Sequence, residues 1–231
     1  MTKKKNSKRK TVCIFLCFCT VLLTGAVVSG NIIFDKLQQL PVYGSDETVA
    51  EYNDWRLILV NRTHKIPDGF NEELTLLDCG KYVDSRIYPD LQRMFDSMRD
   101  EGIYPFVNEG YRTREEQEQM LEDKVNAYIY DGVSEKLARK LAEESVAAAG
   151  TSEHELGIAV DIIADKTKSD NEDVYRWLAE NAYKYGFILR YPQDKTELTG
   201  FEYEPWHYRY VGIDAAAEIF ERGICLEEYL E

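Results

Sequence analysis

The pattern of apolar and polar residues predicts five helices after position 87. In each segment apolar residues recur at intervals of three and four, which is the spacing of a helix with one buried face. The predicted helices cover residues 88–101, 113–130, 134–149, 171–186 and 213–222. The residues expected to face inward in the second and third helices are Met120, Leu121, Val125, Leu137, Leu141 and Val146. Thr113 and Glu116 have the spacing of a capping box at the start of the second helix.

Short apolar runs outside these helices predict strands. The runs are WRLILVN (55–61), IYPFVNEGYRT (103–113), IAVDII (158–163), FILRYP (187–192) and EPWHYRYVG (204–212). Alternate side chains of a strand face opposite sides, so Ala159 and Asp161 are expected on one face and Val160 and Ile162 on the other. Strands and helices do not alternate strictly along the chain. The sequence therefore predicts an α+β fold with a mainly antiparallel sheet and flanking helices, rather than a doubly wound sheet.

A basic tail and an uncharged apolar run precede the predicted domain. The run begins at residue 12, continues to Phe34, and reaches the length of about 20 residues that crosses a membrane. Because a basic flank stays in the cytoplasm, we expect a single-pass membrane protein whose body is extracellular. Secretion after cleavage of a signal peptide is the alternative. The expected parts are a basic cytoplasmic tail (1–10), a transmembrane anchor or signal segment (11–34), a stalk (35–54) and one folded domain (55–231).

Length and charge restrict the class of protein further. A chain of 231 residues can form one full hydrophobic core, and we expect a single domain. Six of its 28 Lys and Arg residues lie in the first ten positions, so 22 basic residues remain against 42 acidic ones. The chain beyond residue 30 therefore has a formal charge of −20, compared with −14 for the whole chain. Such a body repels nucleic acid, and no nucleic-acid partner is expected. The sequence does not indicate an oligomeric state.

The segment SEHELGIAVDI (152–162) contains a candidate metal site. Asp161 projects from an otherwise apolar strand, where an unpaired carboxylate is costly and should meet a cation. His154 lies just upstream, and Gly157 between them allows the chain to bend and another group to approach closely. Two interpretations are open at this point. The residues bind a metal, or Asp161 caps a turn and His154 is an ordinary exposed histidine.

A second segment, EYEPWHYRYVG (202–212), supplies another histidine, His207, three residues after Glu204. Two histidines and one carboxylate are a zinc ligand set that leaves the fourth position for water, as in catalytic sites. A nearby carboxylate that does not bind the metal can then transfer the proton, and Glu204 is placed for this role. Its alternative role is that of a solvated acid at the end of a strand. His64 is expected to be structural or exposed. The cysteines outside the apolar run, Cys79 and Cys225, form no metal-binding pattern, and nothing in the sequence brings them together.

These segments carry a resemblance to a known family. SEHELGIAVD has the form SxHxxGxxxD and EPWH has the form ExxH, and in this order they resemble the VanY-type zinc D-Ala-D-Ala carboxypeptidases of the peptidase M15 family. LILVNRTHKIP, GYRTREEQ, YGFILRYP and TGFEYEPWHYRYVG also resemble family segments in matching order, over roughly residues 55 to 225. The resemblance implies a fold like that of Hedgehog and the zinc DD-peptidases, one zinc ion, and the zinc ligands His154, Asp161 and His207. It also implies Glu204 as the catalytic base.

The resemblance further implies roles for three residues around the expected zinc. Arg112, in GYRT, matches the family arginine that contacts the substrate and steadies the developing oxyanion. Its alternative is a surface arginine paired with Glu109 or Glu116. Gln117 and Ser152 match positions that line the substrate pocket.

The sequence thus predicts a membrane-anchored zinc carboxypeptidase that removes the terminal D-Ala from peptidoglycan stem peptides outside the cytoplasmic membrane. Water at the zinc is the expected nucleophile. An L,D-carboxypeptidase that acts on tetrapeptide stems is the alternative within the same chemistry. A zinc-stabilised cell-wall-binding module without catalytic activity is the alternative from another class.

Overall fold

The computed structural model describes residues 54–231. The expected basic tail, the anchor or signal segment, and the stalk up to residue 53 lie outside the described residues. Within residues 54–231, no helix combines the length and the apolar character that crossing a membrane requires.

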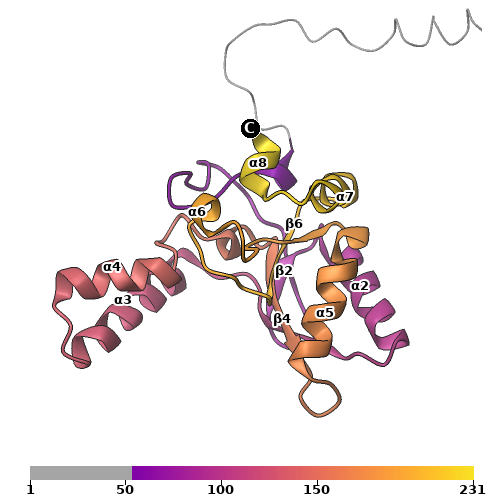
Figure 1. The fold of residues 1–231 in the computed structure, drawn as a ribbon, viewed down its shortest axis with the longest axis horizontal. Helices are drawn as coiled ribbons and strands as arrows, with labels where there is room; N and C mark the ends of the chain where they lie inside the picture. The colour runs from indigo at the N-terminus through magenta and orange to yellow at the C-terminus, as the bar shows by residue number, and fades with distance from the viewer. Residues whose placement is uncertain (1–53) are drawn as a thin grey trace, which may run out of the picture. The chain divides into compact units, whose positions relative to one another are not determined.

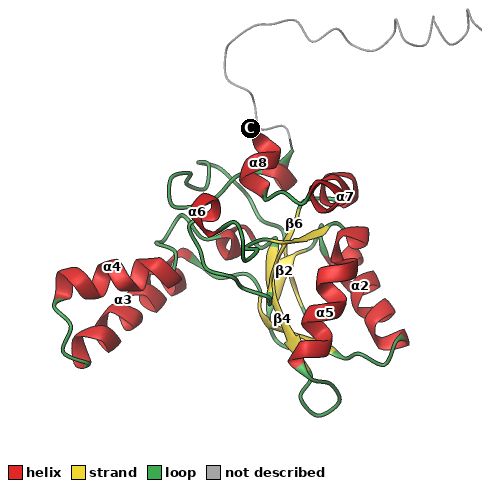
Figure 2. Cartoon of the chain, viewed as in Figure 1, coloured by secondary structure: helices red, strands yellow, loops and turns green. Residues whose placement is uncertain are grey.

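A four-stranded sheet forms the centre of the domain (Figures 1 and 2). Its strands lie in the order β3 (Pro105–Glu109), β4 (Ala159–Ala164), β6 (His207–Tyr210) and β5 (Phe187–Leu189). Every neighbouring pair is antiparallel. A separate antiparallel hairpin joins β1 (Leu74–Leu76) to β2 (Tyr82–Asp84). The predicted α+β class with antiparallel strands is therefore confirmed.

The two faces of the sheet have different environments. Val160, Ile162 and Ala164 of β4 face the main hydrophobic core, beneath α2 (Tyr88–Asp100) and α5 (Asn171–Asn181). Figure 2 shows these two helices next to each other beside the sheet. Because side chains alternate along a strand, Ala159 and Asp161 project from the opposite face, as predicted.

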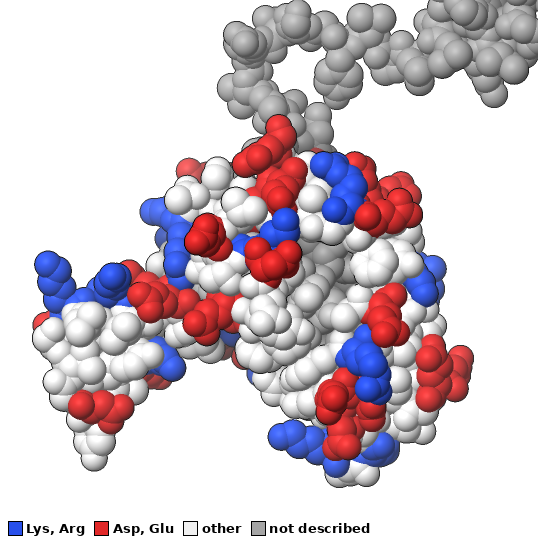
Figure 3. All heavy atoms as spheres, in the orientation of Figure 1, with Lys and Arg blue, Asp and Glu red and all other residues white. Residues whose placement is uncertain are grey.

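A smaller apolar cluster lies at the C-terminal end of the chain. Ile188 of β5 and Val211 pack there with α7 (Ile213–Arg222) and α8 (Leu226–Leu230). Two short elements flank β5 in the sequence: η3 (Ala182–Tyr185) precedes it, and α6 (Thr196–Thr199) follows it. Figure 3 shows acidic side chains gathered around α8, so part of the acidic charge seen in the sequence is exposed on this face.

Helices α3 (Arg114–Tyr130) and α4 (Glu135–Ser145) form a hairpin that projects from the body (Figure 1). The predicted capping box at Thr113 and Glu116 is present. The hairpin has a small core of its own, formed by Leu121, Val125, Ala138 and Ala142.

The sequence prediction for this hairpin was wrong in three details. Met120 and Leu137 are exposed, by 37% and 48%, although both were expected to face inward. The third helix ends at Ser145 rather than near residue 149. The buried residues of α4 at the interface are the alanines Ala138 and Ala142, whereas the larger Leu137, next to Ala138 in the sequence, lies on the exposed side of the helix.

The predicted strand at residues 55–61 was also wrong. Trp55–Leu57 forms a 3-10 helix, η1, which Asp54 caps by accepting a hydrogen bond from the Arg56 amide. The Arg209 side chain donates to the carbonyls of Arg56 and Ile58 at 3.0 and 2.8 Å. These backbone groups are therefore satisfied by a buried side chain instead of a neighbouring strand.

Candidate active site

The register of two central strands brings the first pair of site residues together. Asp161 of β4 lies directly opposite His207 of β6, so both side chains project from the same face of the sheet. The Nδ1 atom of His207 lies 3.1 Å from Oδ1 of Asp161. This contact joins two residues that are far apart in the sequence, and it follows from the pairing of the strands.

The third residue, His154, comes from the 3-10 helix η2 (Glu153–Leu156), which precedes β4. Its Nδ1 donates to the Gly110 carbonyl at 2.8 Å, and its Nε2 faces Asp161 Oδ1 at 3.4 Å. Gly157 ends η2 with a φ of 70°, and its carbonyl accepts from the Asp84 amide at 2.8 Å. The bend and the close approach expected at Gly157 are therefore present, and they direct the chain from His154 into β4.

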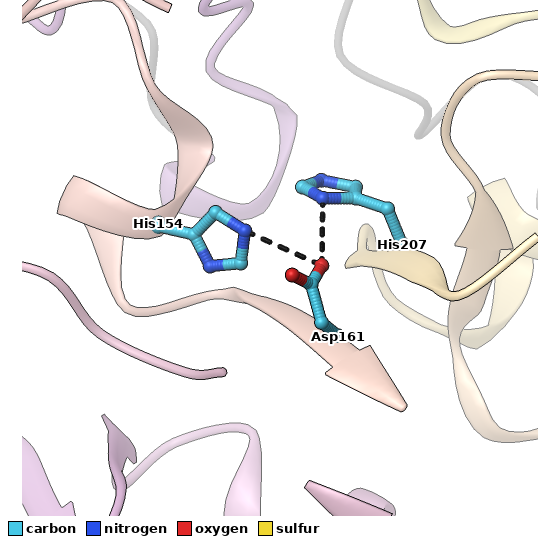
Figure 4. A group of neighbouring side chains, drawn as sticks. All are labelled: His154, Asp161 and His207. Carbon is cyan, nitrogen blue, oxygen red and sulfur yellow. Dashed lines mark hydrogen bonds and ion pairs between the residues drawn. The ribbon is translucent and has the colours of Figure 1, made fainter. Parts of the chain in front are cut away.

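The three side chains form a group with the chemistry of a zinc site (Figure 4). One ligand atom from each of His154, Asp161 and His207 lies within 4.8 Å of the others. Two imidazoles and one carboxylate suit Zn²⁺ and leave a coordination position open for catalysis. The hydrogen bond from His154 Nδ1 to a carbonyl fixes the tautomer that offers Nε2 to a metal. The residues present therefore fit zinc.

The charges of this group depend on one another. Burial raises the pKa of Asp161, but the two neighbouring imidazoles lower it more, and the resulting pKa lies far below the ordinary value. Burial lowers the pKa of His207, but the neighbouring carboxylates of Asp161 and Glu153 raise it more, to about 9. Without a cation, the group thus holds a proton that balances its carboxylates. A metal ion can replace this proton, which is the usual coupling of metal binding to proton release.

Glu204 lies next to the His154, Asp161 and His207 group but is not one of its three potential ligands. Its Oε2 is 3.8 Å from His207 Nδ1, and its carbonyl accepts from the His207 amide in the turn that leads into β6. Burial raises the pKa of Glu204, and the charge of His207 offsets part of this effect. A carboxyl with a raised pKa next to a metal site is suited to accepting and returning a proton.

The remaining predicted residues line the same cavity, whose volume is about 140 Å³. Arg112 is 8% exposed and donates to Gln117 Oε1 at 2.5 Å, while Gln117 donates to the Ala147 carbonyl. Arg112 also lies 3.6 Å from Glu109, so it has this expected partner without being a surface residue. Ser152 is buried at the start of η2. All seven predicted site residues therefore border one cavity.

Sequence reasoning missed part of the cavity wall. The rings of Tyr191 and Phe201 are 4.8 Å apart, and Tyr191 lies 4.8 Å from the His207 ring. Trp206 also borders the cavity. These aromatic residues lie in the segments that carry the family resemblance, but nothing in their spacing indicates that they face the site.

Two other predictions concern residues away from the cavity. His64 is exposed, and its Nδ1 contacts Asn61, so it does not contribute to the metal group. Cys79 and Cys225 are free cysteines.

The antiparallel α+β fold and the His/Asp/His site define a zinc metallopeptidase. A family model described as VanY, D-alanyl-D-alanine carboxypeptidase, matches residues 80–213, which is more than half of the chain. The chain belongs to this family.

Individual relatives agree with this assignment. A D-alanyl-D-alanine carboxypeptidase of Enterococcus faecalis is 54% identical over 181 residues, which are 78% of this chain and 68% of the relative. The zinc(II) complex of a variant of the vancomycin resistance D,D-pentapeptidase VanY, from a VanB-type resistance cassette, is 53% identical with a TM-score of 0.74. It covers 77% of this chain and 100% of its own. A structure of VanYB with D-alanine-D-alanine is 54% identical, with the same TM-score, and covers 77% of this chain and 98% of its own.

Proposed function

We propose that this domain hydrolyses the terminal peptide bond of peptidoglycan stem peptides that end in D-Ala-D-Ala. The proposal depends mainly on one observation: His154, Asp161 and His207 converge in a small cavity that Glu204 and Arg112 also border. The volume of about 140 Å³ suits a small terminal residue. Membership of the VanY family supports D,D-carboxypeptidase activity over the L,D-carboxypeptidase and the non-catalytic binding module.

The chain's own residues divide the chemistry between them. His154, Asp161 and His207 would hold zinc, which polarises the scissile carbonyl and makes water a better nucleophile at neutral pH. Glu204 removes a proton from the attacking water and returns it to the leaving amine of D-Ala. Its raised pKa suits both steps, because the group must give up the proton that it has accepted.

Arg112 has a fixed position from which it can stabilise negative charge. Its backbone amide donates to the His154 carbonyl at 3.2 Å, and its guanidinium is held by Gln117. A preorganised guanidinium can bind the substrate carboxylate or the oxygen that becomes negative during the reaction. Gln117 thus acts chiefly by holding Arg112, and Ser152 contributes to the wall of the cavity.

The cellular location is a further part of the proposal. The apolar segment at residues 11–34 and the basic tail before it support a membrane anchor that leaves the domain outside the cytoplasmic membrane. The stem peptides of the cell wall are found there. Protease treatment of intact cells would test this orientation: an extracellular domain is digested without lysis, whereas a cytoplasmic one is protected.

A direct assay of substrate choice tests the proposed activity. The zinc-loaded protein is incubated with a pentapeptide stem that ends in D-Ala-D-Ala and, separately, with the tetrapeptide stem that lacks the last residue. Mass spectrometry should show loss of one alanine from the pentapeptide and little change in the tetrapeptide. Preferential cleavage of the tetrapeptide would contradict the proposed D,D specificity.

A further inference from the structure

A fully buried acid, Glu153, lies directly behind the metal group. Its Oε1 accepts from Arg190 Nε and from an Nη atom of Arg209, both at 2.7 Å. Its Oε2 is buried and has no hydrogen-bond partner among the described residues. The Nε2 atom of His207 is also buried, and no group within residues 54–231 forms a hydrogen bond with it. These two atoms are 3.6 Å apart.

Leaving both atoms unpaired would be costly. A buried polar group without a hydrogen bond has lost its hydration without compensation, and the cost is larger for a charged group. The two atoms are complementary, because a carboxylate oxygen can only accept whereas an imidazole nitrogen can donate. A small shift would shorten their separation to the roughly 2.7–3.2 Å of a hydrogen bond.

The two arginines that hold Glu153 are already engaged by other groups. Arg190 makes two hydrogen bonds to the Glu227 carboxylate, at 2.8 and 2.6 Å. Arg209 donates to the carbonyls of residues 56 and 58. Two guanidinium groups thus hold one oxygen of Glu153 and leave the other oxygen without a partner among the described residues. The second oxygen of Glu153 is therefore an available acceptor that faces one imidazole nitrogen.

The two imidazoles of the site have opposite orientations. His154 presents Nε2 to Asp161 and uses Nδ1 to donate to a backbone carbonyl. His207 presents Nδ1 to Asp161, so its Nε2 points away from the metal group. A neutral imidazole that offers the Nδ1 lone pair to a cation carries its proton on Nε2. That proton needs an acceptor, and Glu153 provides one.

We propose that Glu153 is a positioning residue of the zinc site, which accepts a hydrogen bond from His207 Nε2 and thereby presents His207 Nδ1 to the metal. The pair forms a carboxylate–histidine–metal arrangement, in which the acid fixes the ring and its tautomer and strengthens the ligand. Arg190 and Arg209 in turn hold the acid in place. The inference rests on the proposed role of His207 as a zinc ligand.

Zinc affinity in two matched variants tests this role. Glu153→Gln keeps the shape of the side chain, but the group that faces His207 is no longer a charged acceptor. Glu227→Gln is the control, because it removes an acid from the same arginine network without contact with His207. Competition with a chromophoric chelator should show about 10–100-fold weaker zinc binding in Glu153→Gln, the usual cost of losing such a partner. The affinity of Glu227→Gln should stay within about twofold of wild type. Equal affinity in Glu153→Gln and wild type would overturn the proposal.

A measurement on the unaltered protein covers the case in which Glu153→Gln does not fold. In the zinc-loaded enzyme, long-range ¹H–¹⁵N correlation spectra of ¹⁵N-labelled histidines report which ring nitrogen carries the proton. We expect His207 to be protonated at Nε2, with an NH proton that is protected from exchange with solvent. Protonation of His207 at Nδ1, or a rapidly exchanging Nε2 proton, would overturn the proposal. Loss of zinc binding by His207→Ala tests the ligand role separately, so the two failures can be told apart.

Discussion

The sheet and the helical hairpin contribute to the same cavity but are stabilised very differently. Asp161 and His207 are fixed by paired strands whose opposite face is covered by the main core. The α3–α4 hairpin, which carries Gln117, has a core of four buried residues. Catalytic geometry on rigid elements is more accurate than geometry on mobile ones. Two of the three expected zinc ligands thus lie on the sheet, whereas we expect the hairpin to affect substrate binding through Gln117.

This difference gives the two regions separable roles. Substitutions on the sheet side should change zinc affinity. Substitutions in the hairpin should change the kinetics with the peptide and leave zinc in place. The following predictions test this separation.

The largest effect is expected from removing a metal ligand on the sheet. Asp161→Ala should abolish zinc binding and lower kcat/KM by at least about a thousandfold, more than the 10–100-fold that follows loss of an outer partner. His64→Ala is a suitable control, because this exposed histidine lies outside the metal group. Zinc content by atomic absorption and release of D-Ala are the measurements. Full zinc content in Asp161→Ala would disprove its role as a ligand.

The next effect is a loss of turnover without loss of metal. Glu204→Gln removes the group that transfers the proton but retains its shape, and kcat should fall by roughly 10²–10⁴-fold. Zinc affinity should remain close to that of wild type, because Glu204 is not among the three clustered ligands. Steady-state kinetics and chelator competition on the same preparation measure both quantities. Unchanged kcat would require another base.

A smaller effect is expected from weakening the hairpin core. Leu121→Ala removes a side chain that is 6% exposed, and it should loosen α3 and raise KM by about threefold to tenfold. Hydrogen exchange of α3 amides should become faster while that of β4 stays slow. Met98→Ala, in the main core, is the comparison. Its destabilisation of about 2–5 kcal/mol should lower the global unfolding free energy. If Leu121→Ala reduced zinc affinity, the two regions would not be separable.

The smallest predicted effect concerns acid stability. The pKa of Glu227 is raised by burial but lowered more by Arg190, and the folded value lies below the ordinary 4.5. The folded state then binds fewer protons than the unfolded state, so stability is lost as the pH falls below about 4.5. Glu227→Gln should reduce the slope of unfolding free energy against pH in this range. Urea denaturation of the metal-free protein at several pH values measures the slope, and equal slopes would contradict the assignment.

The sequence predicted the ligands better than their surroundings. Strand alternation placed Asp161 apart from the apolar face of its strand, and the resemblance to the zinc carboxypeptidases joined it with His154 and His207 as one ligand set. Glu153 could not be identified in the same way. It is one of two similar acids that flank His154, and its role depends on arginines at positions 190 and 209.

The errors in the predicted fold have a similar cause. The segment 55–61 has the composition of a strand, but its carbonyls are satisfied by Arg209, which lies more than 150 positions away. Leu137 fits an apolar helix pattern, yet the interface uses alanines. A local sequence pattern indicates which secondary structure a segment prefers. The structure of residues 55–61 and the exposure of Leu137 depend instead on residues elsewhere in the chain.

The identity of the metal ligands is the central claim, and anomalous X-ray diffraction at the zinc edge tests it most directly. Crystals of the zinc-loaded protein should show one strong anomalous peak about 2.0–2.2 Å from His154 Nε2, an oxygen of Asp161 and His207 Nδ1. A peak at another position, or zinc bound through His207 Nε2, would contradict the account.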